Sequence, residues 1–187
     1  MHRPISPHYV DVSKDTPFPD CRSPRVLERA GVMLHGSAGT NSLGWLQRRE
    51  PHQEKRSSAD FLVDREGTIY QIGVPGWYTY HAGNCQWRDR RLAAREANQL
   101  FVGVEIENVE DGTTPITDIQ YIAVAALIRN LLWNHRLPVP NVVTHAALAI
   151  PRGRKSDPKT LSWPILSREL IHPSKEAFLI EFPKVMP

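Results

Sequence analysis

Two histidines and an aspartate occupy positions from which they could bind a metal ion. His145 follows the short apolar run Val142-Val143, and Asp157 lies in the loop-rich segment after it. Far upstream, His35 ends the apolar run Gly31–Leu34. A catalytic zinc ion needs neutral or anionic nitrogen and oxygen ligands, with a fourth position left for water. His35, His145 and Asp157 therefore predict an open zinc site and, with it, hydrolytic chemistry.

Each of these three residues also has a simpler interpretation. A histidine at the end of a strand can merely hydrogen-bond to backbone, and an aspartate before a proline is usually a turn former. Two histidines in the same kind of position favour the metal site, because strand ends of an α/β sheet are where functional groups gather. The small residues Gly36 to Gly39 after His35 also leave space above its side chain.

Lys155 precedes Asp157 by two residues. In an extended segment, residues i and i+2 point the same way, which would bring the ammonium group near the metal. There it could stabilise an oxyanion. The alternative is an ordinary surface lysine.

Two glutamates lie on one face of an otherwise apolar strand predicted over Phe101–Asn108. Phe101, Gly103, Glu105 and Glu107 share that face. A buried carboxylate is costly unless it is paired or functional, so at least one glutamate should face a cleft, where it could act as a general base. The alternative is an edge strand with one solvated face. His81, in Tyr80-His-Ala-Gly83, is a candidate for substrate contact rather than for metal binding.

The elements that must position these groups alternate between strands and helices. A hairpin is indicated by the turn Asp64-Arg-Glu-Gly67, and a helix over Leu43–Arg49 is expected to be capped by one of Thr40, Asn41 or Ser42. The predicted strands are Gly31–Leu34, Phe61–Val63, Thr68–Ile72, Phe101–Asn108 and Val142-Val143, and the predicted helices are Leu43–Arg49, Asp118–Asn134 and Ser162–Leu170. This order predicts an α/β fold with a single mixed central β-sheet flanked by helices.

The clearest helix covers Asp118–Asn134. Thr117 and Gln120 form a capping box at its start. Apolar residues then recur at helical spacing and predict a stripe that faces the core; they are Tyr121, Val124, Ala125, Ile128, Leu131 and Leu132. We expect residues 1–26 to form a proline-rich arm, residues 27–170 the catalytic domain, and residues 171–187 an extended tail.

The composition is that of a globular domain. Of 187 residues, 41% are hydrophobic and 23% charged. No apolar run is long enough to span a membrane, and the N-terminus lacks the apolar core of a secretory signal, so we expect a protein that acts in the cytosol or leaves it by another route. The net charge of +3 suits an anionic polymer partner. No nucleic-acid-binding motif occurs, Cys21 and Cys85 are expected to be free thiols, and we expect a monomer.

Six short motifs, taken together and in order, resemble those of a known family. They are L-H-G-S-A-G-T, S-A-D-F-L-V-D-R-E-G-T-I-Y-Q, Y-H-A-G, V-G-V-E-I-E-N, V-T-H and R-K-S-D-P, and they run from about residue 31 to 158. The chain resembles the zinc-dependent N-acetylmuramoyl-L-alanine amidases of the type-2 amidase and peptidoglycan-recognition group.

The resemblance implies roles for eight residues. His35, His145 and Asp157 would bind zinc, Glu105 would be the catalytic acid/base, and Lys155 would support the tetrahedral intermediate. Tyr80, His81 and Asn84 would line the groove for glycan or peptide. The implied reaction cleaves the amide between the lactyl group of N-acetylmuramic acid and L-alanine in bacterial peptidoglycan or muropeptides.

The chain departs from the family pattern at two places. Where relatives commonly show S-A-H-[FY] or G-Y-H-F, this chain has Ser58-Ala59-Asp60-Phe61. The catalytic tyrosine of the phage-lysozyme branch is thus Ala59 here, which moves the proton transfer onto Glu105. Asp60 in place of the histidine leaves the local hydrogen bonding open. Lys159 replaces the usual glycine after D-P.

Three functional settings follow from the resemblance. The mildly basic single domain favours a phage-type endolysin, and a cytosolic amidase that trims recycled muropeptides is the alternative. A non-catalytic peptidoglycan-binding module is a third, although such proteins typically lack part of the ligand set. A zinc peptidase of another kind would instead cut within the stem peptide.

Overall fold

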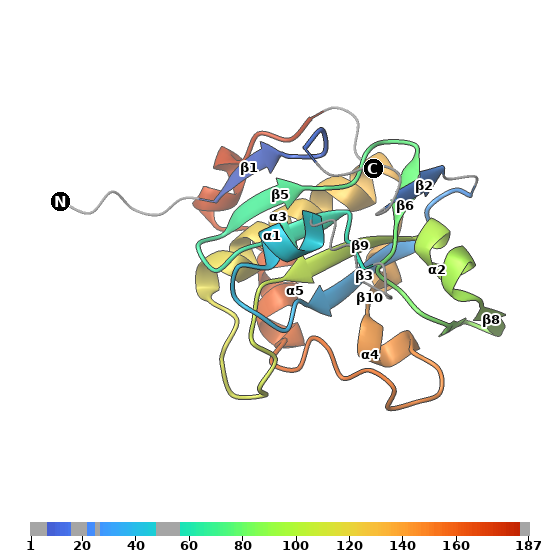
Figure 1. The fold of residues 1–187 in the computed structure, drawn as a ribbon. Coiled ribbons are helices and arrows are strands. Elements are labelled where there is room, and N and C mark those ends of the chain that lie inside the picture. The colour runs from blue at the N-terminus through green and yellow to red at the C-terminus, as the bar shows by residue number, and fades with distance from the viewer. Residues whose placement is uncertain (1–6, 16–21, 25–26, 48–56, 184–187) are drawn as a thin grey trace.

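The computed structural model describes residues 7–15, 22–24, 27–47 and 57–183. A six-stranded sheet forms its centre (Figure 1), in the order β1-β5-β4-β9-β3-β10. The strands are β1 (His8–Asp11), β3 (Gly31–Gly36), β4 (Phe61–Val63), β5 (Thr68–Gln71), β9 (Phe101–Ile106) and β10 (Val142–Thr144). Within this sheet, as described, the β4–β5 pairing is antiparallel and the other four pairings are parallel. The predicted mixed central sheet is confirmed.

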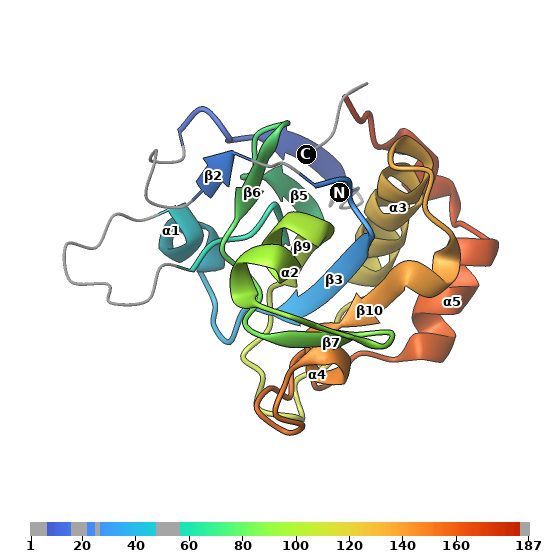
Figure 2. The ribbon, with the colours of Figure 1, turned by 90° about the vertical axis from the view of Figure 1, so that its right-hand side faces the viewer.

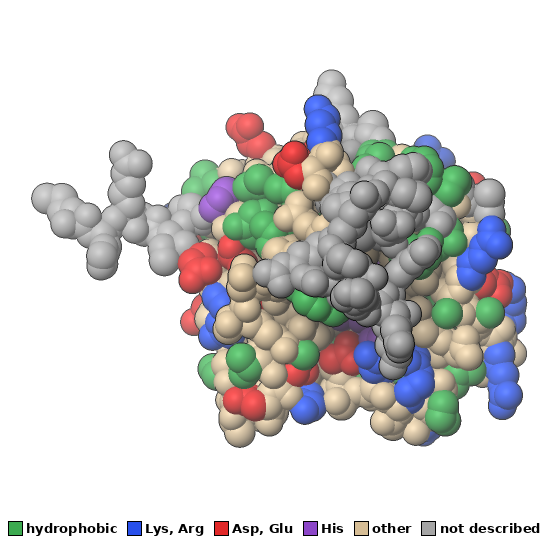
Figure 3. All heavy atoms as spheres, in the orientation of Figure 1, with side chains coloured by type: hydrophobic (Ala, Val, Ile, Leu, Met, Phe, Trp, Pro, Cys, Tyr) green, Lys and Arg blue, Asp and Glu red, His purple; other side chains and the backbone are tan. Residues whose placement is uncertain are grey.

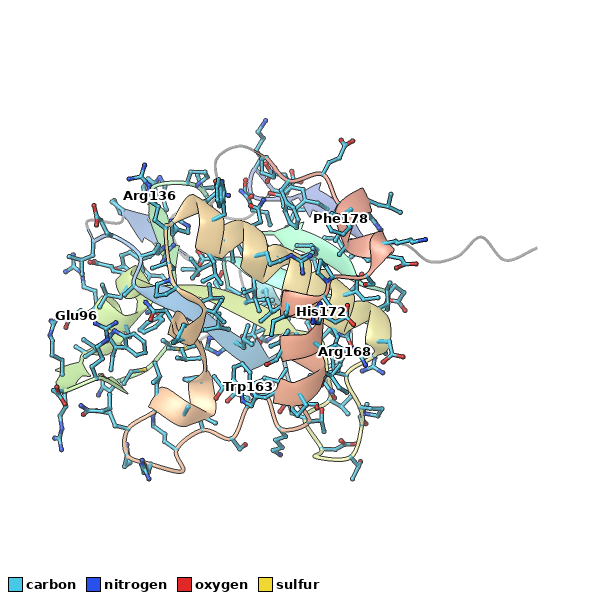
Figure 4. All side chains as sticks on the ribbon, turned by 180° about the vertical axis from the view of Figure 1, so that it is seen from behind. Glu96, Arg136, Trp163, Arg168, His172 and Phe178 are labelled. Atoms are coloured by element: carbon cyan, nitrogen blue, oxygen red, sulfur yellow. The ribbon has the colours of Figure 1, made fainter. Side chains whose placement is uncertain are left out.

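The two faces of the sheet differ in what covers them. Val32 and Leu34 of β3, together with Val102 and Val104 of β9, pack on the face covered by α3 (Asp118–Asn134) and α5 (Trp163–Ile171). Figure 4 shows both helices lying over the sheet from behind. The alternate residues point to the other face, which carries the site residues, as the period-2 pattern of a strand requires.

Helix α3 begins and ends where the sequence predicts. Its capping box is formed, because Thr117 Oγ1 accepts from the Gln120 backbone N–H and the Gln120 side chain accepts from the Thr117 N–H. All six residues of the predicted stripe are buried. Helix α3 therefore covers one face of the sheet, and the opposite face of the sheet stays available for the site residues.

Smaller elements cover the other face, around α2 (Ala94–Leu100) (Figure 2). A second apolar cluster lies here and includes Met33, Ala82, Leu92, Phe101 and Leu148. The elements are the paired strands β2 (Arg22–Pro24) and β6 (Trp77–Thr79), the hairpin of β7 (Cys85–Trp87) and β8 (Arg90–Leu92), and helix α4 (His145–Leu148). The sequence pattern predicted none of these elements.

Both predicted terminal segments contain regular structure. Within the predicted proline-rich arm, β1 joins the main sheet as an edge strand parallel to β5. Within the predicted extended tail, the 3-10 helix Lys175–Leu179 lies against α3, where Ala177 and Ile180 join the main core. The expectation of an extended tail was wrong at this point because two apolar side chains three residues apart reach the same core.

Helix α1 covers Ser42–Gln47, whereas Leu43–Arg49 was predicted. Residues 48 and 49 lie outside the described residues, as does Cys21. The Ser42 N–H donates to Glu107 Oε1 at 2.9 Å, so a carboxylate from beyond β9 satisfies the start of this helix. Among the described residues, no helix combines the length and apolar character needed to cross a membrane.

Candidate active site

Three side chains converge at one edge of the sheet. His35 Nδ1 lies 3.0 Å from His145 Nδ1, and Asp157 Oδ2 lies 3.1 Å from His145 Nδ1 and 3.5 Å from His35 Nδ1. Tetrahedral zinc with bonds near 2.0–2.1 Å holds its ligand atoms roughly 3.3 Å apart. The two imidazoles and the carboxylate are thus suitable ligand types for zinc, and their ligand atoms lie at suitable distances from one another to bind one zinc ion. The predicted ligand set is brought together.

Parallel pairing explains this convergence. β9, β3 and β10 run side by side in the same direction, and their registers place His35 opposite Glu105 and Leu34 opposite Thr144. His145, which follows Thr144, therefore lies beside the end of β3. Groups more than 100 residues apart in sequence meet because carboxyl ends of parallel strands share one sheet edge.

His145 is the first residue of the short helix α4. Thr144 caps α4, because its hydroxyl accepts from the Ala147 N–H at 3.2 Å. The Ala146 N–H in turn donates to the Asp157 carbonyl at 3.0 Å. This hydrogen bond joins the two ends of the segment between His145 and Asp157, so the position of Asp157 is fixed relative to α4.

Burial sets the protonation of the predicted ligands. His35 is only 2% exposed, and burial lowers the pKa of its imidazole to about 4, with Asp157 partly opposing the shift. Burial would raise the pKa of Asp157, but hydrogen bonds with His145 and His35 outweigh it and hold that pKa well below its usual range. A neutral imidazole beside an ionised carboxylate is the state in which both can donate electron pairs to a metal.

Glu105 lies beside the predicted ligands and faces the same cavity. It sits on β9, which has a partner on each side, so the interpretation as an edge strand is wrong. Burial and the nearby Asp157 charge raise the pKa of Glu105 to about 8, with Lys155 partly opposing the shift. Its buried Oε2 has no hydrogen-bond partner in the described part of the chain. A carboxyl with a raised pKa and a free oxygen in a cavity is suited to proton transfer.

The cavity has a volume of about 440 Å³ and is lined by His35, Glu105, His145, Lys155 and Asp157, among others. Figure 3 shows acidic, basic and histidine side chains meeting in the lower half of the face that it presents. Lys155 is exposed on the rim of the cavity. The five residues predicted to bind metal or assist catalysis thus surround one space.

The three predicted substrate contacts are placed differently from one another. His81 also lines the cavity, but it is 8% exposed and both its ring nitrogens lie within hydrogen-bonding distance of protein atoms. Tyr80 packs edge-on against Tyr78. Asn84 Oδ1 accepts from the Ala94 N–H at the start of α2. Tyr80 and Asn84 are not among the residues that line the cavity, and their contact with substrate stays a prediction.

The residue that replaces the family histidine forms a buried ion pair. Asp60 Oδ1 lies 3.3 Å from Arg29 Nη2, and Asp60 Oδ2 accepts from the Gly103 N–H at 2.8 Å. Both side chains are fully buried. Arg29 Nη1 also donates to the Phe101 carbonyl at 2.5 Å. Asp60 thus binds both the backbone of β9 and Arg29. The sequence analysis did not single out Arg29, because it lies 31 residues before Asp60 and no local pattern links the two.

Lys159, the second departure from the family pattern, is tied to another residue that the sequence analysis missed. Its backbone N–H donates to Glu110 Oε2 at 2.8 Å, and its ammonium group donates to the Glu110 carbonyl at 2.5 Å. Glu110 lies directly over Gly36, where an added Cβ would meet its carboxylate. Trp45 and Val109, both partly exposed, line the same cavity and are further candidates for substrate contact.

Comparison with known proteins agrees with this geometry. Residues 27–160 match the model of the N-acetylmuramoyl-L-alanine amidase family. The chain belongs to that family.

Individual relatives cover parts of the chain. A 1,6-anhydro-N-acetylmuramyl-L-alanine amidase of Enterobacter cloacae is 31% identical over 101 residues, which are 54% of this chain and 50% of that protein. The chain therefore spans about half the length of this curated relative. The Pseudomonas aeruginosa protein AmpDh3, solved in complex with anhydromuramic pentapeptide, has a TM-score of 0.60 at 25% identity, covering 78% of this chain and 61% of that one. A mutant endolysin from Bacillus subtilis shares the fold, with a TM-score of 0.60 at 19% identity and coverage of 87% and 97%.

Proposed function

We propose that this protein hydrolyses the amide between N-acetylmuramic acid and L-alanine, with a zinc ion held by His35, His145 and Asp157. The observation that carries the proposal is the meeting of three metal-ligand atoms, all within 4.8 Å of one another, beside the buried Glu105, whose Oε2 has no hydrogen-bond partner among the described residues. A zinc ion bound there supplies a Lewis acid for the amide carbonyl and activates water.

The chain's own residues account for the rest of the reaction. Glu105 accepts a proton from the attacking water at its free Oε2 and returns it to the leaving nitrogen of L-alanine. Lys155, on the rim of the cavity, stabilises negative charge that develops on the carbonyl oxygen. Ala59 is fully buried and carries no proton donor, so it cannot take over from Glu105.

The favoured substrate is a soluble muropeptide that carries an anhydromuramic sugar. The Enterobacter cloacae relative is named for the 1,6-anhydro sugar, and the Pseudomonas aeruginosa structure contains an anhydromuramic peptide. The recycling role, held as the alternative from sequence, is therefore better supported than the endolysin role. The endolysin role stays a second candidate, because the Bacillus subtilis endolysin shares the fold.

The complete ligand set argues against a purely binding function. A module that only recognises peptidoglycan has no need of a metal ligand set beside a carboxyl with a raised pKa. In this chain the two histidines, the aspartate and Glu105 all face one cavity.

The test is mass spectrometry of digests of two substrates, purified anhydro-muropeptides and intact sacculi, with zinc-loaded protein and with a chelated control. Free stem peptides that begin with L-alanine, released only when zinc is present, would establish the amidase reaction. Release from anhydro-muropeptides alone supports the recycling role, and release from sacculi supports the endolysin role. Sacculi that bind the protein without release of peptide from either substrate would favour a binding module.

A further inference from the structure

His81 forms the middle of a hydrogen-bonded chain that ends at a predicted zinc ligand. Its Nε2 lies 3.2 Å from the Phe101 carbonyl oxygen, and its Nδ1 lies 3.0 Å from His35 Nε2. His35 in turn directs Nδ1 toward His145 and Asp157. The chain therefore joins the backbone of β9 to the atom that would bind the metal.

The donor and the acceptor of each hydrogen bond in this chain follow from the Phe101 carbonyl at one end, which can only accept. A carbonyl oxygen can only accept, so His81 Nε2 must carry the proton of that bond. A neutral imidazole has one N–H, which leaves His81 Nδ1 as an acceptor. His35 must then donate from Nε2, and its Nδ1 keeps a lone pair. That is the tautomer in which His35 Nδ1 can bind a metal.

The surroundings keep His81 neutral. The residue is 8% exposed, and the Arg29 guanidinium donates to the same Phe101 carbonyl, so a second cation at this point is unfavourable. Both ring nitrogens of His81 have protein partners, and neither is left to offer to a substrate.

The ring of His81 is held in place from two sides. An added Cβ at Gly103 would lie 2.4 Å from His81 Cγ, so the ring lies directly against the backbone of β9 and needs a glycine there. Asn98 Oδ1 accepts from the backbone N–H groups of His81 and Ala82 at 3.0 and 2.7 Å. Asn98 thus fixes the backbone of His81, and the close backbone of β9 confines its ring.

We propose that His81 is a positioning residue that holds His35 in the metal-binding tautomer and orientation, and that it acts through His35 rather than by contact with substrate. The inference rests on the proposed zinc site but not on the identity of the substrate. Groups that hold a metal-bound histidine through its second nitrogen typically change metal affinity by about 10–100-fold when removed.

Three variants separate this role from a merely structural one. His81→Phe keeps a ring but removes the acceptor. His81→Asn keeps an acceptor near the position of Nδ1. Gly103→Ala leaves His81 unchanged and displaces its ring. His172→Asn is the matched control, because His172 is an exposed histidine on the back face of the molecule (Figure 4).

The measurement is the zinc dissociation constant, obtained by competition with a chromogenic chelator on variants whose circular dichroism matches that of the wild type. We expect about 10–100-fold weaker binding for His81→Phe and for Gly103→Ala. We expect a smaller loss for His81→Asn and no change for His172→Asn. Nitrogen-15 NMR of the zinc-loaded wild type should show His35 protonated at Nε2.

Two results would overturn the inference. One is zinc binding by His81→Phe as tight as that of the wild type. The other is a wild-type spectrum in which His35 Nε2 carries no proton, which needs no variant to fold. If the wild type binds zinc and releases L-alanine peptides while His81→Phe is unaffected, this inference fails and the proposed function stands. If the wild type binds no zinc, both fail.

Discussion

Glu105 stands directly opposite His35 in the parallel pairing of β9 with β3. Backbone hydrogen bonds between the two strands therefore set the separation of the proposed base from a proposed metal ligand. A shift of either strand by one residue would send the side chain of that strand to the face covered by α3 and separate the two groups. The relationship makes the two roles separable by mutation, because each side chain can be changed while the pairing of the strands remains.

Asp157→Ala should abolish tight zinc binding. The carboxylate is the only anionic ligand of the predicted set, and two neutral imidazoles alone hold zinc poorly. Isothermal titration with zinc measures the loss. Asp111→Ala, which changes an exposed aspartate of another loop, is the control and should bind zinc normally. Unchanged affinity in Asp157→Ala would remove this residue from the ligand set.

Glu105→Gln should keep zinc affinity close to that of the wild type while turnover falls by about 10²–10⁴-fold. Glutamine preserves shape but cannot accept the proton of the attacking water. The measurement pairs zinc titration with the rate of L-alanine peptide release. A Glu105→Gln enzyme with wild-type turnover would show that another group is the base.

Lys155→Met should lower kcat by about 10²–10³-fold with zinc binding unchanged. The ammonium group lies on the rim of the cavity and would act on charge that develops only during the reaction. Steady-state kinetics on a purified muropeptide gives kcat and KM separately. Lys175→Met, in the 3-10 helix at the back, is the matched control. A change in KM alone would mean that Lys155 binds substrate without stabilising the transition state.

Asp60→Ala should destabilise the fold by about 3–5 kcal/mol, because it leaves the Arg29 guanidinium buried without its carboxylate. Asp60→His, which restores the residue common in the family, should also destabilise this chain, since an imidazole cannot neutralise that charge. Urea unfolding measures both. The double variant Arg29→Met/Asp60→Ala should lose less stability than the sum of its two single variants, and strict additivity would contradict the ion-pair explanation.

The metal-free protein should lose stability as the pH rises from 7 to 8. Folded Glu105 keeps its proton up to its pKa of about 8, whereas in the unfolded chain the pKa is the ordinary 4.5. The folded state thus binds one more proton in this window, and stability falls by about 1.4 kcal/mol for each pH unit. Burial keeps His35 and His81 neutral in the folded state, so both gain protons on unfolding near pH 6.5 and oppose the Glu105 slope there; above pH 7 this opposing contribution is small.

Urea unfolding in the presence of a chelator, at pH 7, 7.5 and 8, measures this slope. Glu105→Gln has no such proton and should show a much flatter profile. Equal slopes in the two proteins would mean that the carboxyl is not held protonated by its burial.

Local patterns in the sequence predicted the parts of the fold that depend on them. The helix Asp118–Asn134 has its own capping box and apolar stripe, and the strand of Glu105 has strict alternation. The convergence of His35, His145 and Asp157 was also predictable, because metal chemistry restricts the residue types and the strand ends restrict their places.

Other parts depend on partners that are distant in sequence. Strand β1 has only four residues and forms because β5 offers its free edge. His81 was expected to touch substrate, but its bonding partners are 46 residues before it and 20 residues after it, and no local spacing indicates them. Helix α4 covers only His145–Leu148 and owes its start to the side chain of Thr144.

The hydrogen bond between the Ala146 N–H and the Asp157 carbonyl holds the two ends of the segment between them together. Residues 151–154, within this segment, are exposed and supply Gly153 and Arg154 to the rim of the cavity, but none of the predicted ligands. This stretch could therefore be lengthened, shortened or exchanged between relatives while the ligands keep their places. A change in what the rim contacts does not require the proposed metal site to be rebuilt.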